Sequence, residues 1–329
     1  MGKLDSALER YAAMVNKRME KYVPRTGDPA TLYRPIWELL DRGGKRFRPA
    51  LTFLFCEAVG GQARKALSAA VAVEILHNMT LIHDDIEDQS ELRRGKPCIH
   101  IMFGLPAAIN SGDAMLIKVF EAAADGPLDL ATKDSLVEQF ADRAFQITRG
   151  QALEFELNTR QDFTDRDVVE VLRNKTGALV ALACEAGAIV GGASRRELSA
   201  ATKFGESAGV GFQIIDDILN VAGEVQKYGK EIGGDIREGK RTIMAAHLIK
   251  SAPPDTRDRF MSLLGKPTIT QQEISQAIEM YRQFGSVNYA KGIAKKYAEN
   301  ALGALEKLPK REPRELLGSL AEFLVRRDF

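Results

Sequence analysis

The chain has 329 residues, of which 45% are hydrophobic and 28% are charged, and this composition excludes an intrinsically disordered protein. A formal net charge of +1 provides no overall field toward nucleic acid or an anionic membrane, so an anionic ligand must be bound by local charges. No apolar run approaches the roughly 20 residues of a membrane span. Three scattered cysteines and a charged N-terminal segment argue against a disulfide framework and a signal peptide, so we expect a cytoplasmic protein.

Apolar residues recur at spacings of three and four along most of the chain, and this period predicts helices separated by glycine and proline pairs. In chain order, the predicted helices cover residues 3–22, 32–42, 48–59, 64–88, 105–123, 132–159, 165–173, 176–190, 196–221, 242–251, 271–284, 287–307 and 314–326. No segment alternates with a period of two over the length of a strand. We therefore predict an all-α fold in which residues 1–329 form a single domain of about a dozen helices.

Residues 222–241 differ from the segments around them. They are rich in glycine and basic residues and have too little apolar content for a buried helix. This composition predicts a mobile, charged loop, the kind of connection that often carries function.

The predicted helix 64–88 ends in a cluster of acidic residues. Asp84 and Asp88 are four residues apart, so both carboxylates project from one face of the helix, with Asp85 about 100° round the axis. Like charges at this spacing are destabilising unless a cation lies between them. An apolar segment directly upstream would bury the helix, so the cluster indicates a cation site with oxygen ligands, which suits magnesium.

A second acidic cluster repeats this arrangement. Asp216 and Asp217 lie in residues 212–220, again with apolar flanks, and Asn220 ends the segment. Either cluster alone is also typical of a solvated helix end. Two such clusters within otherwise apolar helices favour metal binding.

Basic residues gather in four places. Lys45, Arg46 and Arg48 lie on a glycine-rich turn at residues 43–49, and further cations follow the first acidic cluster at Arg93 and Arg94. The third site is Lys175, which together with Thr176 is expected to open a helix whose free amides favour an anion. The fourth is the pair Lys230 and Lys240 in the glycine-rich segment. Each alone is typical of a solvated surface charge. Together with two acidic clusters they indicate a substrate that carries a diphosphate.

At this point the pattern resembles the trans-prenyl diphosphate synthase, or polyprenyl synthetase, family, and most of all its geranylgeranyl diphosphate synthases. The matching motifs are GGKRFRP at 43–49, HNMTLIHDDIED at 77–88, LRRGKPCIH at 92–100, KT at 175–176, GFQIIDDILN at 211–220 and GKEIGGDIREGKRT at 229–242. The resemblance implies an isoprenoid synthase fold, with helices around a central cavity, and a homodimer. It implies head-to-tail condensation of an allylic prenyl diphosphate with isopentenyl diphosphate.

The resemblance also implies roles for individual residues. Three magnesium ions would be held on the allylic diphosphate by Asp84, Asp85, Asp88, Asp216 and Asp217. Contacts to that diphosphate would come from Arg93, Lys175, Lys230 and, on closure of the loop, Lys240. The diphosphate of isopentenyl diphosphate would be bound by Lys45, Arg48, His77 and Arg94, with a further contribution from Arg326 and Arg327. The cavity where the allylic cation forms would be lined by Thr176 and Gln213.

One position departs from the family pattern. The second motif usually ends in a third aspartate, and Asn220 occupies that place. An amide is at best a neutral oxygen ligand, so we expect that Asn220 is not an essential metal ligand.

The length of the product depends on the helix beneath the first motif. Residues four, five and eight positions before Asp84 line the first turns below the site, and they are Thr80, Met79 and Leu76. The resemblance implies aromatic residues at the first two positions in many enzymes that stop at fifteen carbons, and neither is aromatic here. We expect a twenty-carbon product, and farnesyl or longer products remain open.

Two other functions are compatible with this fold. A terpene cyclase or a head-to-head synthase would not need the cluster of Lys45, Arg48, His77 and Arg94, which is complete. A non-catalytic partner subunit of a heteromeric synthase would be expected to lose its acidic motifs, and both are present. The sequence favours a chain-elongating enzyme.

Overall fold

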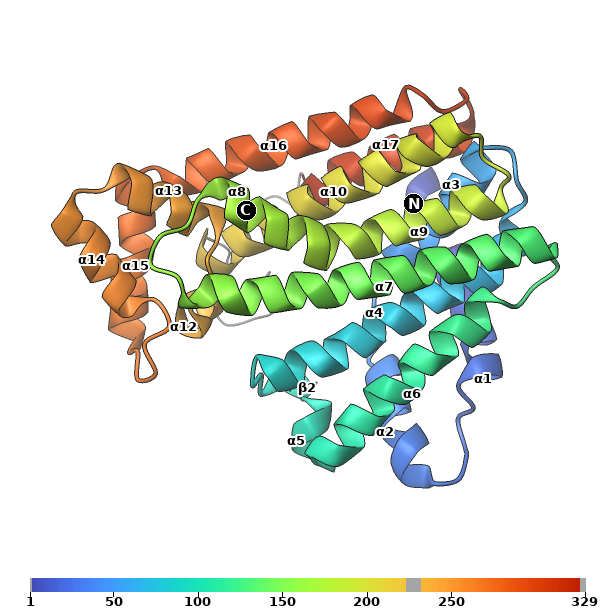
Figure 1. Ribbon diagram of the computed structural model, residues 1–329, viewed down its shortest axis with the longest axis horizontal. Coiled ribbons are helices and arrows are strands. Elements are labelled where there is room, and N and C mark those ends of the chain that lie inside the picture. The colour runs from blue at the N-terminus through green and yellow to red at the C-terminus, as the bar shows by residue number, and fades with distance from the viewer. Residues whose placement is uncertain (1, 223–231, 326–329) are drawn as a thin grey trace. The chain divides into compact units, whose positions relative to one another are not determined.

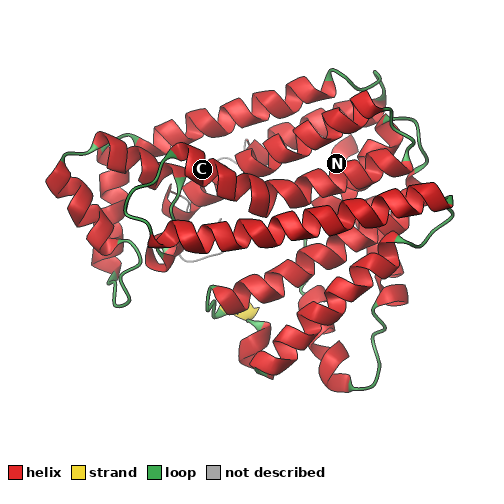
Figure 2. Ribbon diagram, viewed as in Figure 1, coloured by secondary structure: helices red, strands yellow, loops and turns green. Residues whose placement is uncertain are grey.

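The computed structural model describes residues 2–222 and 232–325, with side chains as far as residue 322. The described residues are helical apart from turns and one short strand pair (Figures 1 and 2). They form two compact units, described separately below. Unit 1 comprises Met1–Ala144, Leu179–Gly205 and Ala304–Leu320, and unit 2 comprises Phe145–Ala178, Glu206–Gly303 and Ala321–Phe329. The all-α prediction is confirmed, and the prediction of a single domain stays a prediction.

Unit 1 contains the first acidic motif and the basic turn. Its elements are α1 (Lys3–Tyr22), α2 (Ala30–Leu40), α3 (Phe47–Ala58), the 3-10 turn η1 (Ala63–Ala66), α4 (Leu67–Glu87), β1 (Leu92–Arg93), β2 (Lys96–Pro97), α5 (Ile99–Phe103), α6 (Leu105–Ala123), and parts of α7 (Leu130–Thr159), α9 (Ala178–Val190), α10 (Arg195–Ala222), α16 (Ser286–Leu305) and α17 (Glu312–Val325).

Helix α4 is the central helix of unit 1. It packs against α1, α3 and α6, and all side chains from Ser68 to Leu76 are buried. Close approach of α6 depends on Gly112, because a side chain at this position would collide with the ring of His83. The segment Ala63–Glu87 is the one described helical stretch long and apolar enough to cross a membrane, and most of it is buried within the protein. Its apolar character is therefore accounted for by the burial of Ser68–Leu76 within the protein.

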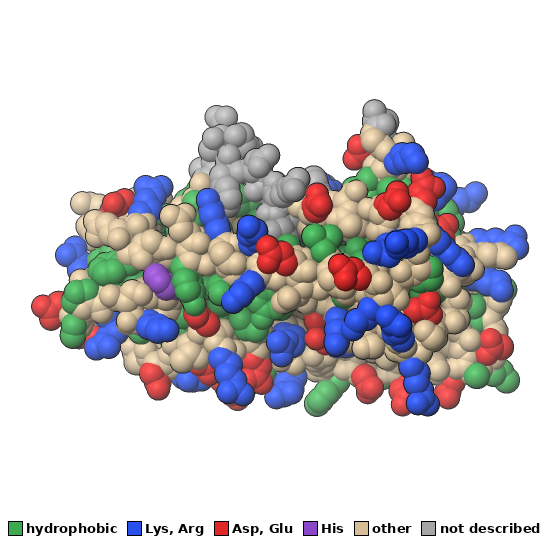
Figure 3. Space-filling view, turned by 90° about the horizontal axis from the view of Figure 1, so that it is seen from above, with side chains coloured by type: hydrophobic (Ala, Val, Ile, Leu, Met, Phe, Trp, Pro, Cys, Tyr) green, Lys and Arg blue, Asp and Glu red, His purple; other side chains and the backbone are tan. Residues whose placement is uncertain are grey.

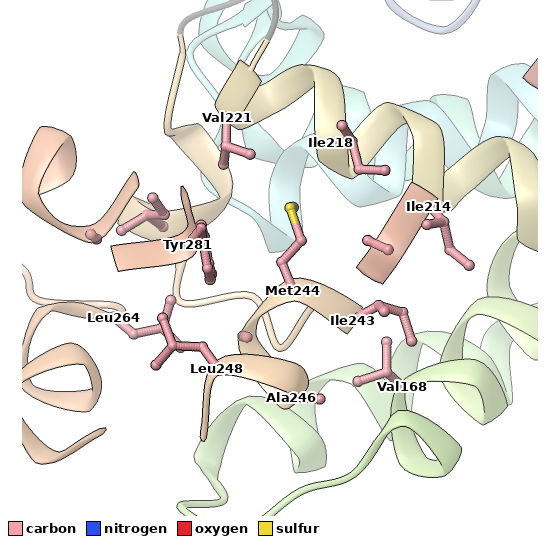
Figure 4. Packing of buried hydrophobic residues seen from close by; sticks show 14 of the residues in the cluster. Val168, Ile214, Ile218, Val221, Ile243, Met244, Ala246, Leu248, Leu264 and Tyr281 are labelled. Atoms are coloured by element: carbon pink, nitrogen blue, oxygen red, sulfur yellow. The ribbon is translucent and has the colours of Figure 1, made fainter. Parts of the chain in front are cut away.

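Unit 2 contains the second acidic motif. Its elements are the end of α7, α8 (Asp165–Leu172), the π-helical turn η2 (Arg173–Gly177), most of α10, α12 (Gly234–Glu238), α13 (Ile243–Ser251), α14 (Pro254–Leu263), α15 (Gln271–Gln283) and most of α16. Figure 4 shows the packing of Ile214 and Ile218 of α10 near Ile243 and Met244 of α13, with Tyr281 of α15 close by. This apolar cluster packs against one face of α10. The acidic residues Asp216 and Asp217 lie between the apolar residues of α10 in the sequence.

The predicted helices are mostly confirmed, and α1 begins and ends where the period predicts. Within the described part of the chain, three short helices were not predicted: α5, α12 and α14. Helices α5 and α12 have five residues each, too few to show a period, and α14 buries only Phe260 and Leu263. The loop predicted at 222–241 is therefore wrong at Gly234–Glu238, whereas residues 223–231 lie outside the described part of the chain.

Two further local predictions are corrected. Lys175 and Thr176 do not open a helix, because η2 connects α8 to α9 without a break and the amide of Ala178 donates to the carbonyl of Arg173. Strands β1 and β2 form a hairpin that the period did not indicate. Its two turn residues, Arg94 and Gly95, have positive φ angles of 53° and 73°, as the tight turns of such hairpins require.

Charges are distributed as the small net charge leads one to expect. On the face shown in Figure 3, Lys and Arg side chains are interspersed with Asp and Glu. A strong local field on this face must therefore come from particular clusters of residues.

Candidate active site

The first acidic motif lies at the C-terminal end of α4. Asp84 and Asp88 are partly exposed, and Asp88 is the residue that caps the helix. Asp85, in contrast, is buried, with 1% of its surface exposed. Asp85 was predicted to point in a different direction from Asp84 and Asp88, and it is buried whereas they are partly exposed.

Asp85 binds Arg93 of the hairpin. Its Oδ1 atom accepts a hydrogen bond from Nε of Arg93 at 2.8 Å and a second from Nη2, whereas its buried Oδ2 atom has no hydrogen-bond partner among the residues that the structure describes. Burial tends to lower the pKa of Arg93, but the hydrogen bond and charge of Asp85 outweigh this effect and the pKa is raised. Arg93 is thus held as a permanent cation beside the first motif, at a site predicted to bind diphosphate.

The hairpin is fixed by a second arginine. Arg42, at the end of α2, donates from Nη1 to the carbonyl of Arg93 at 3.0 Å and from Nη2 to the carbonyl of Pro97 at 2.8 Å. These bonds hold both strands beside the basic turn at 43–49. Arg94 completes the link, because its Nη1 atom donates to the carbonyl of Gly43.

The basic turn gathers the residues predicted to bind isopentenyl diphosphate. Nη1 of Arg48 lies 3.3 Å from Nε2 of His77, and since arginine can only donate, this ring nitrogen accepts. Burial, followed by the charges of Arg48 and Arg94, lowers the pKa of His77 well below its ordinary value, so the ring is neutral near pH 7. Burial and the charge of Arg46 also lower the pKa of Arg94. Lys45 is exposed at the tip of the turn. The structure therefore brings Arg48, His77 and Arg94 together.

The second acidic motif lies on α10 in unit 2. Asp216 is partly exposed and Asp217 is buried. Burial raises the pKa of Asp217 well above its ordinary value, and the nearby charges of Asp235 and Asp216 add to this effect. The Nε2 atom of Gln213 opposes it by donating to Oδ1 of Asp217 at 3.0 Å. Such a group of carboxylates favours a nearby cation.

Gln213 also connects the second motif to the π-helical turn. Its Oε1 atom accepts a hydrogen bond from Oγ1 of Thr176 at 3.1 Å. In the same turn, Nζ of Lys175 lies 2.6 Å from Oε2 of Glu154 on α7. Gly150 permits this arrangement, because a side chain there would collide with the backbone of Lys175. Thr176, Gln213 and Lys175 thus lie on elements that pack directly on one another.

Asn220 has a structural partner. Its Oδ1 atom accepts a hydrogen bond from the amide of Asp235 at 3.1 Å, and its carbonyl accepts one from the amide of Gly233 at 2.8 Å. These bonds hold the start of α12 against the end of α10. They also place Asp235 where its charge affects Asp217.

Among the described residues, several acidic side chains near the predicted ligands were not identified from the sequence, and Glu154 and Asp235 are two of them. Asp235 lies within the matched motif at 229–242, directly after two glycines, which is the signal that could have identified it. Nζ of Lys240 lies 2.9 Å from Oε2 of Glu238 and 3.6 Å from Oδ1 of Asp235. Glu154 has no local signal, because its contact to Lys175 is distant in sequence. Lys230, Arg326 and Arg327 lie outside the described residues.

The residues predicted to set the product length follow one side of α4. Leu76 and Met79 are buried, and Thr80 is partly exposed with its hydroxyl donating to the carbonyl of His77 at 2.9 Å. Exposure therefore increases along the helix toward Asp84.

The acidic residues fit magnesium held jointly with a substrate. Among residues 2–222 and 232–322, no three His, Cys, Asp or Glu side chains are grouped closely enough to hold a metal ion on their own. Magnesium commonly takes only one or two carboxylates and completes its shell with water and phosphate oxygens. A nearby cation would provide a partner for the buried Oδ2 atom of Asp85. Near Asp217, a cation would favour the charged carboxylate and so lower the raised pKa.

Comparison with known proteins supplies a family. Residues 29–281 match the family model described as Polyprenyl synthetase. The chain is 37% identical over 321 residues to the short chain isoprenyl diphosphate synthase of Methanothermobacter thermautotrophicus, with 98% of each chain covered. Its fold matches the crystal structure of a geranylgeranyl pyrophosphate synthetase from Pyrococcus horikoshii with a TM-score of 0.94, 34% identity and 99% coverage of each chain.

A third similar structure was solved with ligands. It is a polyprenyl synthase from Caulobacter crescentus, complexed with calcium and isoprenyl diphosphate. The identity is 29%, the TM-score is 0.89, and 99% of this chain and 98% of that chain are covered.

Proposed function

This chain belongs to the polyprenyl synthetase family, and on that premise we propose that its main product is the twenty-carbon geranylgeranyl diphosphate. It is a prenyltransferase that condenses isopentenyl diphosphate with an allylic diphosphate, and its family uses divalent metal ions. The observation that carries the proposed length is that the residues of α4 beneath Asp84, which are Leu76, Met79 and Thr80, include no aromatic side chain. A product tail that grows along these residues meets no rigid aromatic ring at the first two positions.

Carboxylates are proposed to hold the metal. As the family resemblance implies, Asp84 and Asp88 of the first motif and Asp216 and Asp217 of the second would ligate three magnesium ions on the allylic diphosphate. Bound magnesium would supply positive charge that stabilises the departing diphosphate. Asp85 was predicted to join this set, and its Oδ2 atom is the oxygen left for that purpose.

Basic side chains are proposed to hold the allylic diphosphate during ionisation. Arg93, fixed by Asp85, and Lys175, held beside Glu154, would donate to its oxygens, and Lys240 would add a third cation. Lys230 is proposed for the same role. The hydroxyl of Thr176 and the amide oxygen of Gln213 present dipoles that would stabilise a neighbouring allylic cation without reacting with it.

The basic turn is proposed to position the second substrate. Lys45, Arg48 and Arg94 would bind the diphosphate of isopentenyl diphosphate, and His77, neutral because its pKa is lowered, would orient Arg48. Holding the double bond near the allylic carbon makes the attack effectively intramolecular. After the new bond forms, the released diphosphate would accept the proton that the elongated chain loses.

The exposed apolar side chains of α5 and α6 support a homodimer. Ile101, Met102, Leu105, Ile109 and Ile117 are all exposed in this chain. Apolar patches of this kind commonly mark an interface between proteins. Light scattering of the purified protein tests this proposal, and a mass equal to one chain would overturn it.

Product analysis tests the proposed length. The purified protein is incubated with magnesium, labelled isopentenyl diphosphate and, separately, dimethylallyl, geranyl or farnesyl diphosphate. All three starters should give a dephosphorylated product of twenty carbons as the main species. A main product of fifteen carbons, or of twenty-five or more, would overturn the assignment. A cytoplasmic location is proposed for the enzyme as well, and fractionation of expressing cells tests it.

A further inference from the structure

Arg46 differs from the other cations of the basic turn. Its backbone adopts the left-handed conformation, with φ 48° and ψ 32°, at the residue that precedes α3. Residues other than glycine adopt this conformation rarely, and it persists where the surroundings fix it. Arg46 is only 7% exposed, whereas Lys45 beside it is exposed. The turn therefore points one of its cations into the protein.

The guanidinium of Arg46 is bound on all sides by the protein. Nη1 donates to Oε1 of Glu74 at 2.6 Å and to the carbonyl of Gly43 at 3.4 Å. Nη2 donates to the carbonyl of Leu40 at 3.2 Å, and Nε donates to Oδ1 of Asn16 at 3.0 Å. These acceptors belong to α1, the end of α2, the basic turn itself and α4. One side chain thus connects the turn to three helices.

Glu74 is the anionic half of this arrangement. It is 2% exposed and also accepts a hydrogen bond from Nδ2 of Asn78 at 2.9 Å. It lies three residues before His77, so both side chains are on the same side of α4. Its charge also raises the pKa of Arg94, opposing the effect of burial and of Arg46. Glu74 is therefore the counter-charge within a cluster that is otherwise cationic.

We propose that Arg46 and Glu74 form a buried clasp that positions the basic turn, and that this clasp sets the affinity for isopentenyl diphosphate. The inference rests on the proposed function, which assigns Lys45, Arg48 and Arg94 to that substrate and His77 to the orientation of Arg48. Arg46 and Glu74 are positioning residues, because the donors of Arg46 are used by protein acceptors. The clasp fixes the carbonyl of Gly43, to which Arg94 also donates, and thereby sets the spacing between the turn and the hairpin.

The substitution Arg46→Lys separates geometry from charge. Lysine keeps the positive charge but donates from a single atom, so it cannot reach acceptors that are spread around a planar guanidinium. We expect KM for isopentenyl diphosphate to rise by about tenfold or more, since the loss of one well-placed hydrogen bond to a charged group weakens binding by about that factor. KM for the allylic diphosphate should stay near the parent value. Glu74→Gln keeps the shape and one acceptor, and it should change the same KM in the same direction but less.

Arg143→Lys is the matched control. Arg143 and Glu185 form a second buried pair in unit 1, with exposures of 9% and 3%, and Nε of Arg143 lies 2.9 Å from Oε2 of Glu185. Both Arg→Lys variants should lower the melting temperature, but only Arg46→Lys should change the ratio of the two KM values. An equal ratio in both variants would show that Arg46 has only a structural role and would overturn the proposal.

Two direct alanine variants distinguish failure of the clasp from failure of the site assignment. If Lys45→Ala and Arg48→Ala raise KM for isopentenyl diphosphate and Arg46→Lys does not, the clasp is wrong and the site assignment stands. If neither alanine variant changes this KM, the assignment itself is wrong and the clasp falls with it. Should Arg46→Lys fail to fold, Glu74→Gln decides by the same ratio, with titration calorimetry of isopentenyl diphosphate as the readout if turnover is lost.

Discussion

The Oδ1 atom of Asn220 lies 3.1 Å from the backbone nitrogen of Asp235, so the residue in the place of the usual third aspartate accepts a hydrogen bond from the start of α12. Its side chain connects two segments that are fifteen residues apart. Because this amide oxygen already accepts a hydrogen bond within the protein, we expect that Asn220 is not an essential metal ligand.

Asn220→Ala should therefore affect stability more than chemistry. Removing the acceptor leaves a partly buried amide of Asp235 without its bond, which costs about 1–3 kcal/mol in the free energy of unfolding. Asp216→Ala should reduce turnover by orders of magnitude with a smaller change in stability. Urea denaturation and turnover at saturating magnesium check both variants. Equal losses of turnover would show that Asn220 acts in catalysis.

Asn220→Asp should leave an active enzyme with a changed response to magnesium. The carboxylate can still accept from the amide of Asp235, but it adds a negative charge near Asp217 and Asp235, where the pKa of Asp217 is already raised. The added charge should increase the affinity for a divalent cation. Turnover titrated with magnesium should show a lower half-saturating concentration, and a higher one would contradict this prediction.

The first motif should divide into two kinds of residue. Asp84→Ala and Asp88→Ala should each reduce turnover by orders of magnitude, because both residues are proposed to ligate the same ions. Asp85→Asn should act partly through Arg93, whose raised pKa and position depend on that carboxylate. We expect Asp85→Asn to raise KM for the allylic diphosphate. Steady-state kinetics with each substrate varied in turn, with a magnesium-free control, measures this difference. A double Asp84→Ala, Asp88→Ala variant that keeps turnover in the presence of a chelator would contradict the metal assignment.

His77 predicts a dependence of stability on pH. The pKa of His77 is lowered in the folded protein, so at mildly acidic pH the unfolded chain binds a proton at His77 that the folded chain does not bind. Its contribution to stability is complete above the ordinary histidine pKa of about 6.5 and is lost as the pH falls below it, with a limiting slope of about 1.4 kcal/mol per pH unit. His77→Gln, which stays neutral, should remove this part of the slope between pH 6.5 and 5. Denaturation curves of both proteins at several pH values measure the difference, and identical slopes would contradict the assigned cause.

The residues beneath Asp84 should act as the limit on chain length. Met79→Phe or Thr80→Phe should shorten the main product by one five-carbon unit, because a rigid ring replaces a flexible or small side chain and overfilling costs about 1–3 kcal/mol. Chromatography of dephosphorylated products beside the parent measures the shift. Unchanged products in both active variants would place the limit elsewhere.

Leu76→Ala should change both the length of the product and the stability of the protein. The sequence predicts a longer or broader set of products. Leu76 is fully buried in the core of unit 1, so its truncation should also cost about 2–5 kcal/mol of stability. Product size should therefore be measured well below the melting temperature of this variant.

The sequence predicts those parts of the protein that depend on local periodicity. Helix α1 and the acidic end of α4 are examples, because a buried face repeats along each helix. Contacts between distant segments are not encoded locally. For that reason Glu154 beside Lys175, and Asp235 beside Asp217, were missed.

Backbone conformation explains the remaining differences. Arg46 is one of three cations in a short stretch, and the sequence does not distinguish it from Lys45 or Arg48. Its positive φ turns it toward Glu74, and this conformation is fixed by the helices around it. Likewise, the break expected before Thr176 is absent because a π-helical turn continues the backbone.

A single-turnover experiment tests the central claim most directly. Excess purified enzyme is mixed with farnesyl diphosphate, labelled isopentenyl diphosphate and magnesium, and the products are quenched and separated. The account predicts one condensation that gives all-trans geranylgeranyl diphosphate and free diphosphate, and no product when magnesium is chelated. Release of diphosphate without label in a twenty-carbon product, or condensation that persists without a divalent metal, would contradict it.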